Sequence, residues 1–131
     1  FLALCTGDKG TASTGAKLHY EGTPFHRVIP GGFVQGGDIE GGHGDGGQSI
    51  FGPTFPDESF SVKQDRAGVL VMANNDAPHT NNSQFYVTLA PMPWMDTKRV
   101  AFGRVISGMR VFRLVAKVDT INQRPKEPVT V

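Results

Sequence analysis

Cysteine is almost absent from this chain of 131 residues, since Cys5 is the only one. A single thiol excludes an intrachain disulfide and any zinc site built from several cysteines. Proteins of reducing compartments use few disulfides, so we expect the protein to be cytoplasmic. The sequence also lacks an apolar run as long as a transmembrane helix, and no membrane partner is expected.

A large excess of charge is also missing. Lysine and arginine number 13 against 12 for aspartate and glutamate, which gives a formal net charge of +1. Binding dominated by nucleic acid phosphates needs a larger basic excess, so no nucleic acid partner is expected. The balance of 38% hydrophobic and 19% charged residues is typical of a globular protein. The length suits one domain over residues 1–131, and we expect a monomer.

The composition disfavours long helices, because 17 glycines and nine prolines interrupt the chain. We therefore predict a mainly β fold. Alternating or short apolar segments predict strands over residues 25–29, 33–36, 69–73, 84–89 and 100–105, and the start of a last strand at 129–131. Helices are expected over residues 1–6, ended by Gly7, and over 109–118. The first helix lacks an opening turn, so we expect the domain to be incomplete at its N-terminus.

Motifs for nucleotide, metal or acid–base chemistry have little support. Residues 42–47 fit the Gly-x-Gly-x-x-Gly pattern, but the segment up to Pro53 cannot start a long helix, so structural turns are the better interpretation. The four histidines show no metal-ligand spacing and no nucleophile motif, and His26 is expected to be a hydrogen-bonded structural residue. No metal and no cofactor are expected. Asn81-Asn82-Ser83 is a glycosylation sequon, which has meaning only in a secreted protein.

One stretch, Phe25–Asp38, carries an unusual mixture of side chains. If it is extended, alternation places Arg27, Phe33 and Gln35 on one face of a sheet. Gln84 and Tyr86 likewise share a face of their own strand. The pattern alone leaves two interpretations open: a face that binds a peptide or ligand, and ordinary core aromatics beside surface polar residues.

At these residues the chain resembles a known family, the cyclophilins, which are peptidyl-prolyl cis/trans isomerases. The motifs are Phe-His-Arg-Val-Ile-Pro at 25–30, Gln-Gly-Gly-Asp at 35–38, Met-Ala-Asn at 72–74, Asn-x-Ser-Gln-Phe-Tyr at 81–86, Trp-Met-Asp at 94–96 and Val-Ala-Phe-Gly at 100–103. The resemblance implies an eight-stranded antiparallel barrel with two helices, whose first two strands are absent from this chain and whose last strand is clipped after Val131. The loop near residues 11–18 resembles a divergent-loop subgroup, in which some members carry a redox-active cysteine at the place of Cys5; no partner thiol is present here.

The resemblance also implies a site. Arg27 matches the catalytic arginine and Gln35 the glutamine that orients it. The matches that bind substrate are Gly32 and Phe33 in the proline pocket, Ala73 and Asn74 through their backbone, Gln84 in the groove, Tyr86 and Met95 in the pocket wall, Trp94 at the pocket edge that also contacts cyclosporin, and Arg99 at the position of a pocket histidine. The implied function is isomerisation of X–Pro bonds in peptides and proteins, which assists folding.

Three departures from the family pattern bear on that function. Gly32 stands where a phenylalanine is usual, Arg99 replaces a histidine, and residues 75–77 carry a one-residue insertion. We expect a wider pocket, weaker catalysis and reduced binding of cyclosporin, unless Phe33 fills the space. The alternative function is a proline-peptide-binding or scaffold module with little catalysis.

Overall fold

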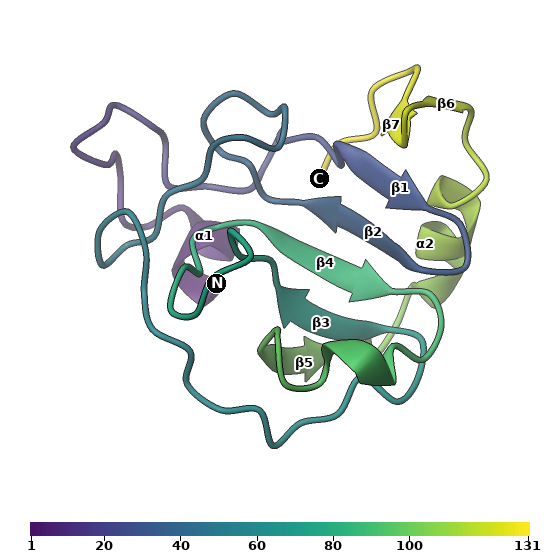
Figure 1. Cartoon of the computed structure of the whole chain (residues 1–131). Helices are drawn as coiled ribbons and strands as arrows, with labels where there is room; N and C mark the ends of the chain where they lie inside the picture. Colours follow the sequence, from purple (N-terminus) through teal and green to yellow (C-terminus); the bar gives the residue numbers. More distant parts are fainter.

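The computed structural model describes residues 1–131 and is mainly β (Figure 1). The elements are α1 (Leu2–Thr6), β1 (Arg27–Ile29), β2 (Phe33–Gly36), β3 (Val69–Met72), β4 (Phe85–Thr88), a 3-10 helix η1 (Pro93–Met95), β5 (Ala101–Arg104), α2 (Met109–Val115), β6 (Thr120–Ile121) and β7 (Arg124–Pro125). β1 to β5 form one antiparallel sheet in the order β1-β2-β4-β3-β5, and β6 and β7 form a separate hairpin.

The predicted strands and helices are confirmed within a few residues. α1 ends at Gly7, which takes the left-handed conformation at φ 70° that the stop signal predicts. α2 ends at Val115, three residues before the predicted end at Val118. The expected last strand is reduced to a single bridge between Pro24 and Thr130. The β6–β7 hairpin was not predicted.

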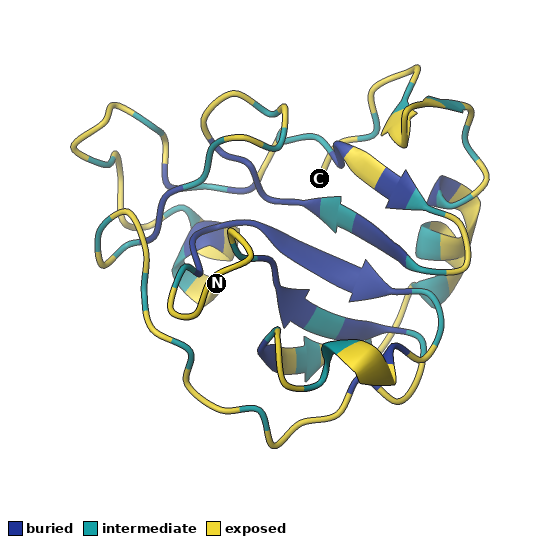
Figure 2. Cartoon of the chain, viewed as in Figure 1, coloured by how far each residue is buried: buried dark blue, intermediate teal, exposed yellow.

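The sheet has two faces of different character. One face carries Val28, Val34, Phe85 and Val87, which pack against Leu4 of α1, Val115 of α2 and the aromatic rings of Tyr20 and Phe25. The opposite face carries a second apolar cluster: Phe33, Val69, Val71, Ala73, Tyr86, Met92 and Ala101. β4 lies in the middle and is buried along its whole length (Figure 2). Because side chains alternate along each strand, one face of the sheet packs against the helices and the opposite face carries a separate apolar cluster.

The mainly β, antiparallel architecture with two helices is confirmed, but the sheet remains open. β1 is covered at its edge by the hairpin, because Val28 N–H donates to the carbonyl of Gln123 at 2.7 Å. β5 is the other end of the strand order. β1 and β5 do not pair with each other, so these five strands form no closed barrel. Neither helix has the length and apolar composition needed to cross a membrane.

Candidate functional site

The predicted polar and aromatic residues lie in one row across the sheet. Arg27 of β1 is the partner of Gln35 of β2, and Gln35 is the partner of Tyr86 of β4. Directly paired residues point to the same face, and Phe33 joins them because it lies two residues before Gln35. The alternation predicted for Phe25–Asp38 is therefore confirmed across the Pro30-Gly31-Gly32 break.

Two aromatic rings form the floor of the site. The ring centroids of Phe33 and Tyr86 are 4.8 Å apart, and both residues are buried, at 8% and 3% exposure. Met95 packs against the same cluster from η1. The guanidinium of Arg27, itself exposed, lies with its Cζ 5.4 Å from the Phe33 ring centroid. An apolar floor thus stands beside a cation that is open to solvent.

The hydroxyl of Tyr86 needs a buried partner, which is Gln64. Tyr86 donates to Gln64 Oε1 at 2.8 Å, and burial raises the pKa of the tyrosine, so that the hydroxyl stays protonated. Gln64 Nε2 in turn donates to the carbonyls of Met95 and Arg99 at 3.2 and 3.4 Å. Gln64 is fully buried and joins the floor to the rim. Sequence reasoning missed this residue, because a lone glutamine in the polar segment 61–66 gives no periodic signal.

A chain of side-chain amides fixes which atom Gln35 offers to a neighbour. Gln84 Nε2 donates to the carbonyls of Gly44 and Gly46 at 2.9 and 2.6 Å, so its Oε1 is left as an acceptor. Gln35 Nε2 donates to that oxygen at 2.9 Å. The free oxygen of Gln35 is therefore an acceptor on the face that carries Arg27. This polarity suits the predicted orienting role of Gln35, although the hydrogen bond of Arg27 goes elsewhere: its Nε donates to Gln123 Oε1 at 2.8 Å.

The glycine-rich loop, residues 37–47, follows β2, supplies those two carbonyls and wraps around the carboxylate of Asp38. The oxygens of Asp38 accept hydrogen bonds from five backbone N–H groups, those of Glu40, Gly41, His43, Gly44 and Gly46. Burial raises the pKa of Asp38, but the N–H donors, led by Gly44 and Glu40, lower it by more, and the net pKa lies below the usual value. The Gly-x-Gly-x-x-Gly segment is thus occupied as an internal turn structure, as the sequence predicted.

The backbone of Asn74 has free hydrogen-bonding capacity beside the floor. Ala73 N–H donates to the carbonyl of Gln84 at 3.0 Å. In contrast, neither the N–H nor the C=O of Asn74 is hydrogen-bonded within the chain. The Asn74 side chain is fixed, because Nδ2 donates to the carbonyl of Lys98 at 3.1 Å and Oδ1 accepts from Asp76 N–H at 3.0 Å. An extended peptide could therefore pair with Asn74, as the resemblance implies.

The remaining predicted residues form a rim over a neighbouring cavity of about 610 Å³. Asn74, Trp94, Met95 and Arg99 line it together with the inserted loop. Trp94 is 62% exposed, and Arg99 forms an ion pair with Asp76. The predicted residues thus lie in two adjoining groups, the row on the sheet and this rim. Met95 and Gln64 connect them.

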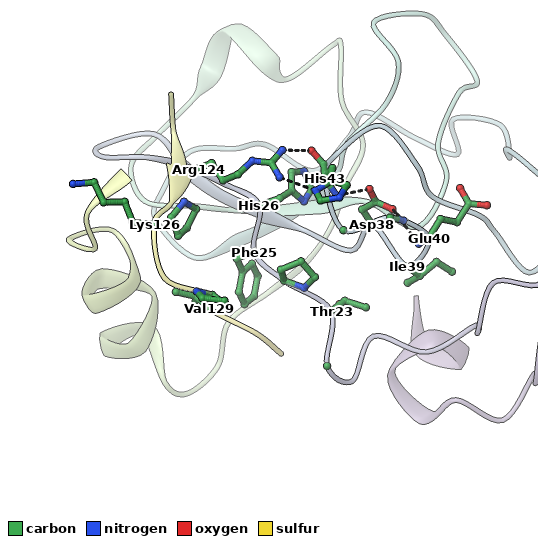
Figure 3. A pocket seen from close by; sticks show the side chains of 16 residues that line it. Thr23, Phe25, His26, Asp38, Ile39, Glu40, His43, Arg124, Lys126 and Val129 are labelled. Atoms are coloured by element: carbon green, nitrogen blue, oxygen red, sulfur yellow. Dashed lines mark hydrogen bonds between the residues drawn. The ribbon is translucent and has the colours of Figure 1, made fainter. Parts of the chain in front are cut away.

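A second cavity of about 370 Å³ lies between the glycine-rich loop and the β6–β7 hairpin (Figure 3). His26 lines it and is 7% exposed, and burial holds the pKa of its imidazole below the usual value. His26 Nδ1 is buried and has no hydrogen-bond partner, so the prediction of a hydrogen-bonded structural histidine is not confirmed at that nitrogen. None of the predicted site residues lines this cavity. Asn81 of the sequon is fully buried, so its side chain is not accessible for glycosylation.

Comparisons with known proteins identify a family and several relatives of this chain. Residues 1–131 match the family described as cyclophilin type peptidyl-prolyl cis-trans isomerase/CLD. A protein of Mus musculus named "Probable inactive peptidyl-prolyl cis-trans isomerase-like 6" is 51% identical over 125 residues, which cover 95% of this chain and 40% of that protein. The Homo sapiens protein of the same name is 50% identical over 125 residues, with the same two shares.

A plant relative carries a different name. "Peptidyl-prolyl cis-trans isomerase CYP21-1" of Arabidopsis thaliana is 46% identical over 132 residues, which cover 100% of this chain and 58% of that protein. The chain therefore spans between 40% and 58% of the length of these curated relatives. Their names divide between an isomerase and proteins described as inactive.

Proposed function

This chain belongs to the cyclophilin-type peptidyl-prolyl cis-trans isomerase family, and we propose that it catalyses the cis/trans isomerisation of X–Pro bonds in peptides and proteins, thereby assisting folding. The observation that carries the proposal is the placement of Arg27. Its guanidinium is exposed, lies over the Phe33 ring and is held through Nε alone, so the terminal N–H groups are free to donate.

The reaction requires no bond to break. Rotation about X–Pro is slow because twisting removes amide resonance, a barrier of roughly 18–20 kcal/mol. In the twisted state the proline nitrogen regains a localised lone pair and becomes a hydrogen-bond acceptor. A donor aimed at that nitrogen stabilises the twisted state over both planar states, which is the requirement for catalysis.

The residues of this site supply the parts of that mechanism. The rings of Phe33 and Tyr86, with Met95, would receive the apolar proline ring. The free backbone N–H and C=O of Asn74 would hold the residue before proline, so that only the far side rotates. The guanidinium of Arg27 presents several N–H donors in a rigid fork. Its Nη atoms would then donate to the proline nitrogen. Cyclosporin would use the same pocket and the exposed Trp94, with reduced affinity.

A second candidate function is a module that binds proline-containing peptides without accelerating their isomerisation. The names of the mouse and human relatives, at 51% and 50% identity, favour it. So does Gly32, because the aromatic side chain usual at that position is absent. The two functions share the pocket and differ only in what Arg27 does there.

The test is the exchange rate between the cis and trans forms of an Ala-Pro peptide, measured by NMR with the parent chain and with Arg27→Ala. We expect the parent to accelerate exchange and Arg27→Ala to lose on the order of 10²-fold, the cost of deleting one preorganised donor. Arg113→Ala is the matched control, because Arg113 is exposed on α2 and outside the site.

Peptide binding separates the two functions. Shift changes on the pocket residues without faster exchange by the parent chain would favour the binding module. Equal exchange rates for the parent and Arg27→Ala would remove Arg27 from the mechanism.

A further inference from the structure

The tip of the β6–β7 hairpin contacts the side chain on which the proposed reaction depends. Arg27 Nε donates to Gln123 Oε1 at 2.8 Å. The Nε of an arginine is its innermost donor, so a bond there fixes the plane of the guanidinium and leaves the outer Nη donors free. No other hydrogen bond to the Arg27 side chain is formed within the chain.

The backbone of Gln123 places the acceptor in register with β1. Its carbonyl accepts from the N–H of Val28, the neighbour of Arg27, at 2.7 Å. The other side of the hairpin is also anchored, because Arg124 Nη1 lies 3.0 Å from His43 Nδ1 and Nη2 donates to the His43 carbonyl (Figure 3). The hairpin is thus fixed to β1 on one side and to the glycine-rich loop on the other.

The conformation at the tip is one that glutamine rarely adopts. Asn122 and Gln123 have φ values of 50° and 67°, the left-handed pair that a two-residue hairpin turn of type I′ requires. Glycine or asparagine suits both positions better, and a side chain such as glutamine is strained there. Strained residues persist only where the surrounding structure holds them, and they cluster at functional sites, so the Gln123 side chain is a candidate for a functional contact.

Burial does not explain the contact. Both Arg27 and Gln123 are exposed, so water could satisfy each side chain if the other were absent. A hydrogen bond between exposed groups contributes little to the stability of the fold. Its effect is therefore on the direction of the guanidinium rather than on folding.

We propose that Gln123 is a positioning residue: it holds Arg27 through Nε so that the Nη donors face the proline nitrogen in the pocket. The inference rests on the proposed function of Arg27. It assigns a role to a hairpin that contributes nothing else to the pocket floor. It also gives Arg27 a support from outside β2, since no hydrogen bond joins the side chains of Arg27 and Gln35.

Two glycine substitutions at the same turn distinguish the effect of losing the Gln123 acceptor from the effect of changing the turn backbone. Gln123→Gly removes the acceptor and relieves the backbone at φ 67°, so the variant is expected to fold. Asn122→Gly relieves the turn in the same way and keeps the acceptor. Gln123→Glu keeps an oxygen at the same reach and should rescue the contact.

Two measurements are made on each variant: the side-chain N–H signal of Arg27 Nε in ¹H–¹⁵N NMR spectra, and kcat and KM on the Ala-Pro peptide. We expect Gln123→Gly to move the Nε signal towards that of free arginine and to lower kcat roughly tenfold with KM within twofold, less than the loss for deleting the donor itself. Asn122→Gly and Gln123→Glu should keep both the signal and the rate.

The outcomes distinguish the inference from the function on which it rests. An unchanged Nε signal and kcat in Gln123→Gly would overturn the positioning role. A parent chain without isomerase activity would end the proposed catalysis, while the Nε signal would still decide whether Gln123 orders Arg27.

Discussion

Gly32 and Phe33 are neighbours in the chain but meet different surroundings. Phe33 is 8% exposed and lies against Tyr86, so an aromatic ring already lines the floor. A Cβ at Gly32 would lie 3.0 Å from Cγ2 of Ile29 and 3.3 Å from its carbonyl oxygen, closer than most side chains tolerate. These contacts favour the alternative that Phe33 fills the space left by the missing phenylalanine.

We therefore expect that Gly32→Phe does not raise the isomerisation rate. The new side chain must displace Ile29, and overpacking of this kind costs roughly 1–3 kcal/mol. The rate is measured by NMR exchange on the Ala-Pro peptide, with Ile29→Ala/Gly32→Phe as the companion variant that removes the close Cγ2 atom. A clear gain in kcat/KM for Gly32→Phe alone would mean instead that the pocket is underfilled.

The loop between β3 and β4 is held by contacts at three places. Asp57 N–H donates to His79 Nδ1 and His79 N–H donates to Asp57 Oδ2, both at 3.0 Å. Asn75 N–H donates to Thr80 Oγ1 at 3.0 Å. Asp76, in the left-handed region at φ 58°, forms the ion pair with Arg99 across the rim. The inserted residues thus bring a counter-charge to an arginine that the resemblance places in the pocket.

We expect Asp76→Asn to change which peptides bind rather than how stable the chain is. The carboxylate is 90% exposed, so the pair contributes about 0–1 kcal/mol to stability. Without it, the Arg99 side chain, 15% exposed at the cavity, can pair with an acidic residue of a bound peptide. Asparagine also tolerates the left-handed backbone of this position.

The measurement is the ratio of Kd values for two proline peptides that differ by Glu against Gln next to the proline. The ratio should shift towards the acidic peptide in Asp76→Asn, and the shift should shrink at high salt. Arg99→Gln/Asp76→Asn is the matched control and should show no preference. An identical ratio in the parent and Asp76→Asn would exclude Arg99 as a contact for the peptide.

The elements divide into those that local pattern predicts and those that it does not. β2, β3 and β4 are short apolar or alternating segments, and the sequence predicts them because burial of one or both faces requires that composition. The β6–β7 hairpin has one exposed aliphatic residue, Ile121, and a proline, Pro125. Its support comes from β1 and from His43, contacts distant in sequence that no local pattern contains.

The same division holds for the site within the whole molecule. Alternation along Phe25–Asp38 was enough to predict that Arg27, Phe33 and Gln35 share one face, because a strand has a period of two. Gln64 and Gln123 were missed, since each acts through one side-chain oxygen whose partner lies on a different element. The roles that the resemblance implies concern residues that would touch a substrate. The residues that hold them in place became visible only from the three-dimensional contacts.

Stability of the whole molecule should depend on pH through His26 and Asp38. Burial lowers the pKa of His26, with Arg124 and Arg27 adding to the effect and Asp38 opposing it. Because the folded state resists protonation, the unfolded chain binds more protons below its own histidine pKa of about 6.5. The stabilising contribution is therefore complete above that pH and is lost as the pH falls. The pKa of Asp38 also lies below the usual value, so its contribution is lost in a second window, below about pH 4.

Urea unfolding at a series of pH values tests this directly. The free energy of unfolding should fall between pH 7 and pH 5, with a slope of at most about 1.4 kcal/mol per pH unit for one proton. His26→Gln, which stays neutral, should flatten that window and leave the acid window below pH 4. His79→Gln controls for the loss of a histidine whose ring is 64% exposed. An equal free energy of unfolding of the parent chain at pH 7 and pH 5 would contradict this prediction. It would mean that the cavity of Figure 3 admits enough water for His26 to take up its proton in the folded state.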